Sequence, residues 1–153
     1  MNLSERLNAD MKDAMRAKEE GKLLLSVIRL IKSAAKYQEI EKGRPLNEEE
    51  LTEVIARELK QRRDVLPEYE KNQRTEMVDS IKQEMAILMN YLPKQLSDDE
   101  LRELIKDVIS QTGASGPKDM GKVMGKITPL TKGKADGRLV SQLVKEALSA
   151  LEN

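Results

Sequence analysis

The chain has 153 residues and a formal net charge of zero, because 27 Lys and Arg side chains balance 27 Asp and Glu. It contains no Cys, His, Trp or Phe, and three Tyr. These absences exclude disulfides, iron–sulfur clusters, metal sites built on Cys or His, and triads that need an imidazole or a thiolate. Three aromatic rings are also too few for the base-stacking surfaces of RRM or OB-fold proteins. We therefore expect no catalytic residues, no metal and no cofactor.

The rest of the composition predicts an all-α protein. Leu, Ile and Val number 37, enough for an aliphatic core, and the abundant residue types are good helix formers. Apolar residues recur at helical spacing, and no segment alternates with the period of two that strands require. No apolar run approaches the roughly 20 residues that span a bilayer. The first residues lack the apolar core of a signal peptide, which predicts a cytoplasmic protein without membrane contact.

The first two helices are predicted over residues 4–18 and 22–42. Gly21 separates them, and its missing side chain suits it to a left-handed helix cap. The apolar residues of each helix fall on one face and predict its buried side. These residues are Leu3, Leu7, Met11 and Met15 in the first helix, and Leu24, Val27, Ile28, Ile31, Ala34, Ala35 and Gln38 in the second.

The third helix begins at a capping box, with Asn47 as the N-cap and Glu50 as its reciprocal partner. Pro67 has no N–H, and its ring clashes with the preceding turn, so we expect it to kink or end this helix near Arg63. The predicted inner face carries Leu51, Val54, Ile55, Leu59, Arg62, Val65 and Leu66.

The fourth helix is predicted over residues 75–91, and Pro93 follows its end. Its inner face carries Val78, Ile81, Met85, Leu88 and Met89. Glu84 lies beside that face, and we expect it to form a structural ion pair with Arg62 of the third helix.

Three further helices are predicted after residue 93. The first begins at a second capping box, Ser97 with Glu100, and ends at Gly113. The others span about residues 118–128 and 136–151. The predicted fold is therefore all-α, with a four-helix, bundle-like N-terminal domain over residues 1–93 and a small three-helix tail domain over residues 97–153.

The segment from residue 112 to residue 138 differs from the rest of the chain in charge and in glycine content. It holds six of the eight Gly. Six basic side chains face two acidic ones there, a local charge of +4. The basic residues are Lys118, Lys122, Lys126, Lys132, Lys134 and Arg138, and the acidic ones are Asp119 and Asp136.

Residues 116–122 have most of the spacing of a phosphate-binding P-loop, but Val123 stands where that motif needs a hydroxyl, and no strand precedes it.

Gly121 and Gly125 lie four apart in one short helix, where each glycine is unfavourable by about 1 kcal/mol relative to alanine. Close packing of a neighbouring helix explains them, and the spacing favours this interpretation. The approach of a phosphate or another macromolecule is the alternative.

The turn before the last helix has two interpretations of its own. Asp136 caps that helix, while Lys132, Gly133, Lys134 and Arg138 surround its N-terminus. Free N–H groups and flanking cations suit a bound phosphate. A solvated loop whose glycines only make the turn is the alternative.

Two segments near the C-terminus are distinctive: residues 120–125, Met-Gly-Lys-Val-Met-Gly, and residues 132–137, Lys-Gly-Lys-Ala-Asp-Gly. Earlier in the chain they are accompanied by Leu30, Ala34, Ala35, Glu39, Arg74, Glu84 and the run Tyr91-Leu92-Pro93. Together these residues resemble the YqeY family of small bacterial proteins, whose C-terminal part is similar to the tail of GatB, a component of the tRNA-dependent amidotransferase. The resemblance is most specific in the two C-terminal segments. Asp136 and Gly137 stand where such tails often carry Asn-Pro.

The resemblance implies an all-helical protein associated with tRNA-dependent aminoacylation. Our first hypothesis is a non-catalytic module that docks on the tRNA backbone through the basic, Gly-rich segment. The alternative is a helical adaptor that binds an aminoacyl-tRNA synthetase or an amidotransferase and exposes the face around Met120, Val123 and Met124. A lesser alternative, also implied by the family, is carbon–nitrogen ligase activity with glutamine as amido donor within a complex. The residues expected to contact RNA or a partner are Gly121, Lys122, Gly125, Lys126, Lys132, Gly133, Lys134, Asp136 and Arg138.

Overall fold

The computed structural model describes residues 1–152 and confirms the all-α fold, with no strand among those residues. The chain divides into two compact units, Met1–Pro93 and Lys94–Asn153. Each unit has a separate cluster of buried apolar side chains. Among the described residues, no helix is long and apolar enough to cross a membrane.

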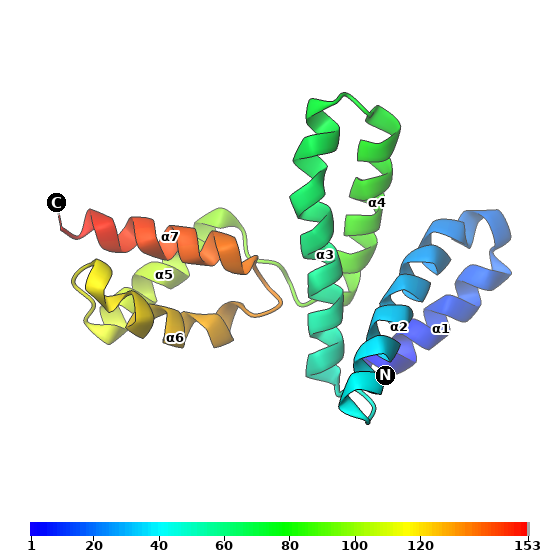
Figure 1. Ribbon diagram of the computed structural model, residues 1–153, viewed down its shortest axis with the longest axis horizontal. Helices are drawn as coiled ribbons and strands as arrows, with labels where there is room; N and C mark the ends of the chain where they lie inside the picture. The colour runs from blue at the N-terminus through cyan, green and yellow to red at the C-terminus, as the bar shows by residue number, and fades with distance from the viewer. Residues whose placement is uncertain (153) are drawn as a thin grey trace. The chain divides into compact units, whose positions relative to one another are not determined.

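The first unit consists of two antiparallel helical hairpins (Figure 1). Helix α1 (Leu3–Arg16) is joined by a short 3₁₀ turn, η1 (Lys18–Gly21), to α2 (Lys22–Lys42). Helix α3 (Glu48–Lys71) turns back into α4 (Thr75–Tyr91). The two hairpins share one aliphatic core, to which every helix contributes. The side chains at its centre include Val27, Ile28, Ile31, Ile55, Leu59 and Leu88, all 1% exposed or less.

The prediction for Gly21 is wrong. Its φ is −93°, so it is not a left-handed cap, and Lys18 carries the positive φ of this connection instead. Glycine is required at position 21 because α1 comes too close for a side chain, and not because of its backbone conformation. A Cβ built on Gly21 would lie 2.1 Å from the backbone oxygen of Ala14. That close approach also places Ala14 in the interior at 3% exposed, while Met15, predicted to be buried, is 53% exposed.

The capping box predicted at the start of α3 is confirmed. The Asn47 side chain accepts the N–H of Glu50 at 2.8 Å, and Glu50 accepts the N–H of Asn47 at 3.1 Å. The Glu50 carboxylate also forms two hydrogen bonds with the Arg44 guanidinium, at 2.8 and 3.1 Å, and contacts Lys42. These partners, Arg44 first and then Lys42 and Asn47, lower the pKa of Glu50 from 4.5 to about 2. The carboxylate thus fixes the connection between α2 and α3.

We expect Glu50 to make the stability of the first unit depend on pH between 4.5 and 2. Its pKa in the folded protein lies below the unfolded value, so the ionised group stabilises the fold above pH 4.5, and this contribution is lost as the pH falls through 2. Urea unfolding of wild type and Glu50→Gln at pH 5 and at pH 2.5 measures it. Wild type should lose more stability on acidification than Glu50→Gln, and Glu41→Gln, which changes an exposed carboxylate, should behave as wild type. Equal acid losses in wild type and Glu50→Gln would contradict the assignment.

The prediction that Pro67 ends the third helix near Arg63 is wrong, because α3 continues through it to Lys71. Pro67 cannot donate to the carbonyl of Arg63, an omission that costs on the order of 3 kcal/mol in a helix interior. The ring is exposed, while Leu66 and Tyr69 beside it are half-buried. Because α3 and α4 lie side by side along this stretch (Figure 1), we attribute the intact helix to packing that offsets the missing hydrogen bond.

The predicted interhelical ion pair is confirmed. Nε of Arg62 lies 3.4 Å from Oε2 of Glu84, and Nη1 of Arg62 lies 2.9 Å from Oε2 of Glu58 on the same helix. All three side chains are largely buried, with exposed fractions of 12%, 20% and 17% respectively. One guanidinium therefore neutralises two carboxylates at the contact between α3 and α4.

A second polar contact joins α1 to the end of α4. The Tyr91 hydroxyl donates to Oδ2 of Asp10 at 2.5 Å, and the guanidinium of Arg6 lies over the tyrosine ring, 4.7 Å from its centroid. Arg6 also donates to the carbonyl of Asn90 at 3.0 Å. Burial, followed by the hydrogen bond to Asp10, raises the pKa of Tyr91. The neutral phenol is thus the form that the fold holds.

The second unit is a three-helix cluster. It comprises α5 (Asp98–Thr112), the 3₁₀ turn η2 (Pro117–Asp119), α6 (Met120–Thr131) and α7 (Gly137–Ala150). The capping box predicted at Ser97 and Glu100 is confirmed, and Gly113 ends α5 with a φ of 68°. The core is aliphatic, and its least exposed side chains are Leu101, Ile105, Val108, Val123, Ile127, Val144 and Leu148.

Candidate nucleic-acid interface

Helix α6 has one apolar side and one side of glycine and lysine. Val123 and Ile127 are fully buried, and Met120 and Met124 pack against the same core. The other side is exposed and consists of Gly121, Lys122, Gly125 and Lys126. At 100° per residue these four positions span an arc of roughly 140°. The helix also runs past its predicted end at residue 128, through Pro129 to Thr131.

The packing interpretation of the two glycines is wrong. A Cβ built on Gly121 or on Gly125 would meet no atom within 4 Å. No neighbouring helix among the described residues needs the space, and helix propensity alone would favour alanine at both positions. The glycines therefore leave a strip of bare backbone open to solvent beside two lysines.

The turn between α6 and α7 is held by the start of the same unit. Nε2 of Gln95 donates to the carbonyl of Gly133 at 2.7 Å, and the N–H of Leu96 donates to the carbonyl of Lys134 at 2.9 Å. Gly133 has a φ of 75°, a left-handed conformation that favours glycine. The backbone of this turn is thus fixed, while the side chains of Lys132 and Lys134 are exposed.

The predicted cap of the last helix is confirmed. Oδ1 of Asp136 accepts the N–H of Arg138 at 3.1 Å, and the Arg138 side chain is exposed. Asp136 therefore occupies one of the N–H groups that a phosphate at this helix end would need. The flanking cations then carry the attraction for an anion. From Lys122 to Lys132 the exposed cations extend over roughly 15 Å of helix.

The segment before α6 is not a P-loop. It follows helix α5 rather than a strand, and it forms a 3₁₀ turn in which Gly116 is buried against the side chain of Glu152. The carboxylate of Asp119 accepts the N–H of Ser115 at 2.8 Å. This hydrogen bond, with smaller contributions from Lys122 and Lys118, lowers the pKa of Asp119. An ionised carboxylate thus occupies the loop where a phosphate would have to lie.

The face proposed for a protein partner is also not free. Val123 is 0% exposed, and Met120 and Met124 are half-buried against the core of the second unit. A partner could reach this face only by displacing the unit's own packing. The exposed side of α6 is the opposite one, with the glycines and lysines.

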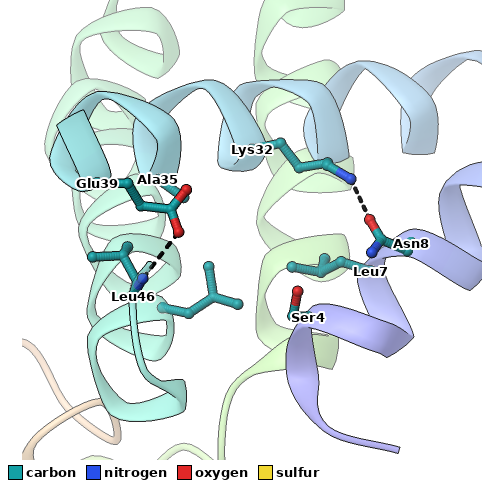
Figure 2. Close-up of a pocket in the computed structure, with 8 residues that line it drawn as sticks. Ser4, Leu7, Asn8, Lys32, Ala35, Glu39 and Leu46 are labelled. Carbon is teal, nitrogen blue, oxygen red and sulfur yellow. Dashed lines mark hydrogen bonds between the residues drawn. The ribbon is translucent and has the colours of Figure 1, made fainter. Parts of the chain in front are cut away.

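Two cavities within the units are small. One, of about 120 Å³, lies in the first unit. Among its lining residues, Lys32 of α2 donates to Asn8 of α1, and Glu39 accepts the N–H of Leu46 at 2.9 Å (Figure 2). A groove of about 280 Å³ lies between α5 and α7, with Arg102 and Glu146 among its lining residues. Both are below the roughly 300–1,000 Å³ of most small-molecule sites. Residues 1–152 also contain no group of three acidic side chains placed to hold a metal ion.

Comparison with known proteins identifies the family. Residues 4–148 match the model of the Yqey-like protein family, which covers nearly the whole chain. The chain belongs to the YqeY family. The resemblance inferred from the sequence is confirmed, and it places the protein in a group related to one component of an amidotransferase.

Two curated relatives of this YqeY protein are yeast proteins named "Altered inheritance of mitochondria protein 41, mitochondrial". The one from Lachancea thermotolerans is 28% identical over 145 residues, which cover 93% of this chain and 76% of the relative. The one from Kluyveromyces lactis is 34% identical over 126 residues, covering 79% and 66%. Their names place those relatives in mitochondria and give no biochemical activity.

A third relative of the YqeY chain is the GatB component of the aspartyl/glutamyl-tRNA(Asn/Gln) amidotransferase of Thermoanaerobacter sp. It is 42% identical over 64 residues, which cover 37% of this chain and 14% of that relative. The similarity is thus high but confined to a small part of a much larger protein.

Sequence reasoning missed the residues that hold the α6–α7 turn. Gln95 and Leu96 stand just before the capping box of α5, and their sequence has no pattern that identifies a partner. Their hydrogen bonds to residues 133 and 134 join positions 38 residues apart, a pairing that local periodicity does not encode.

Proposed function

We propose that this YqeY protein is a non-catalytic module that binds the backbone of tRNA through the exposed side of α6 and the following turn. The observation that carries the proposal is the pair of exposed glycines, Gly121 and Gly125, which have no neighbour within 4 Å. These two glycines neither make a turn nor allow packing inside the protein. A molecule that approaches the backbone of α6 from outside explains their presence.

The charge around the glycines supports a polyanion as that molecule. The side chains of Lys122, Lys126, Lys132, Lys134 and Arg138 are all exposed. Phosphate contacts of this kind are sequence-independent and salt-dependent. Pro129 adds a further feature, because it has no N–H to donate to the carbonyl of Gly125 four residues earlier. A ribose 2′-hydroxyl can donate to such a carbonyl, which favours RNA over DNA.

The comparisons support tRNA as the RNA. By its name, the matched amidotransferase component is part of an enzyme that acts on tRNA charged with aspartate or glutamate. The segments of most specific resemblance, residues 120–125 and 132–137, contain both exposed glycines and three of the four lysines of the proposed interface. We infer recognition without chemistry, since the interface consists mainly of cations and glycines and the carboxylate of Asp136 is engaged as a helix cap.

A titration of tRNA binding at several salt concentrations tests the proposal. Five phosphate contacts predict a slope of log K against log salt of about −4. Changing Lys132, Lys134 and Arg138 to Glu should weaken binding at least tenfold and reduce the slope by about 2.5. Unchanged affinity and slope would overturn the proposal.

Two controls separate the interface from general charge and from folding. Lys106→Glu with Lys145→Glu changes charge at exposed positions of α5 and α7 in the same unit and should reduce binding little. Gly121→Ala with Gly125→Ala should raise helix stability, by about 1 kcal/mol per site, and yet weaken tRNA binding. If the alanine variant bound tRNA as wild type does, the glycines would have no part in recognition. A pull-down with and without RNase tests whether a protein partner is bound directly. If the partner is recovered only without RNase, an RNA bridges it to this protein.

A further inference from the structure

Helix α2 carries a second apolar stripe, which faces solvent. Leu30 is 45% exposed, Tyr37 is 67% exposed and Ile40 is 71% exposed. They stand on the side of α2 away from Val27, Ile28 and Ile31, which fill the core. Three large apolar side chains on one exposed helix face form a patch of the kind that marks protein interaction sites.

The stripe follows a seven-residue repeat. Leu23, Leu30 and Tyr37 are spaced seven apart, and Ser26, Ser33 and Ile40 form a second row displaced by three. This is the a/d pattern of a coiled-coil seam, in which large side chains insert between residues of a facing helix. The small Ser26 and Ser33 allow that helix to approach. The spacing therefore fits a helical partner that lies along α2 for roughly 25 Å.

Charge is placed unevenly beside the stripe. Lys22, Arg29 and Lys36 are also spaced seven apart and are all exposed, so they form one basic row along the flank that corresponds to the g positions. The opposite flank holds Ala34 and Glu41. A partner helix that approaches the stripe meets three cations on one side and a single carboxylate on the other.

We propose that this face of α2 binds an amphipathic helix of another protein, one with an apolar seam and acidic residues along its flank. The basic row determines which kind of helix fits this face. In an antiparallel pair of two copies of this chain the basic rows would face one another, which is unfavourable. In a parallel pair only Lys36 would face a carboxylate, Glu41 of the other copy, while Lys22 and Arg29 would face no opposite charge. An acidic helix pairs with all three cations. The surface lies in the first unit and does not depend on the proposed tRNA interface.

Two synthetic 21-residue heptad peptides test the proposal with the full-length protein. Both have Leu and Ile at a and d; one has Glu and the other Lys at e and g. Fluorescence anisotropy at low salt should show binding of the Glu peptide with a dissociation constant in the micromolar range, at least tenfold tighter than the Lys peptide. Changing Leu30, Tyr37 and Ile40 to Ser should weaken binding of the Glu peptide at least tenfold.

The charge-reversed protein gives the decisive control. Lys22→Glu with Arg29→Glu and Lys36→Glu should exchange the preference, so that the Lys peptide binds more tightly. Met15→Ser removes an exposed apolar side chain from α1 and should leave binding unchanged, and circular dichroism checks that each variant is helical. Equal binding of both peptides, no binding of either at 1 mM, or a dimer in sedimentation that disappears with the serine variant would each overturn the proposal.

Discussion

Replacing Gly21 by alanine should lower the free energy of unfolding of the first unit by about 3 kcal/mol, at the upper end of the cost of overpacking an interior. The added Cβ would lie 2.1 Å from the backbone oxygen and 2.7 Å from the Cα of Ala14. Backbone atoms cannot rotate away as a flexible side chain can, so α1 and α2 must separate. That movement disturbs the core that Leu7 and Ile28 share.

Tyrosine fluorescence during urea unfolding measures this loss in the first unit alone, because Tyr37, Tyr69 and Tyr91 are the three tyrosines and the chain has no Trp. Gly43→Ala is the matched control. Gly43 has a φ of 70° and no atom within 4 Å of a Cβ, so alanine there meets only conformational strain of about 1–2 kcal/mol. A Gly21→Ala variant no less stable than Gly43→Ala would contradict the close-contact assignment.

Replacing Arg62 by alanine should destabilise the first unit by about 3 kcal/mol, because it leaves two largely buried carboxylates without their cation. Glu58 lies 2.9 Å and Glu84 lies 3.4 Å from the guanidinium, and neither is more than 20% exposed. The loss comes mainly from the uncompensated charges and less from the contacts themselves.

A double-mutant cycle separates these contributions. Glu84→Gln in the Arg62→Ala background should recover part of the lost stability, since it removes one of the unpaired charges. The same change in wild type should be destabilising. Arg16→Ala serves as a control, because its ion pair with Asp13 is exposed and contributes little. Additive effects of the Arg62 and Glu84 changes would show that the two side chains are not coupled.

Much of the fold follows from local patterns. The bounds of α2 and α4, Lys22–Lys42 and Thr75–Tyr91, are those expected from apolar spacing and the surrounding glycine and proline residues. The capping boxes at the starts of α3 and α5 are also as predicted, because each involves residues within one turn. The pairing of Arg62 with Glu84 was predictable because both stand beside the inner faces of consecutive helices.

The errors occurred where distant parts of the chain decide the outcome. Helix α3 continues through Pro67 because it packs along α4. Local helix propensity cannot predict this tertiary contact. In the candidate site, residue types and charge located the lysines and the cap at Asp136. Spacing favoured packing for Gly121 and Gly125, whereas both are open to solvent. Spacing shows that two glycines share a helix face, but not whether another helix covers it.

The sequence by itself determined the all-α class, the family and the position of the basic, Gly-rich segment, since these depend on composition and on residues a few positions apart. Only the tertiary structure decided which glycine is required by close contact, Gly21, and which two are exposed, Gly121 and Gly125. It alone also showed that α2 has an exposed apolar stripe at Leu30, Tyr37 and Ile40. The physical reason is that burial depends on which surfaces meet, and neighbours in space are set by the packing of whole helices.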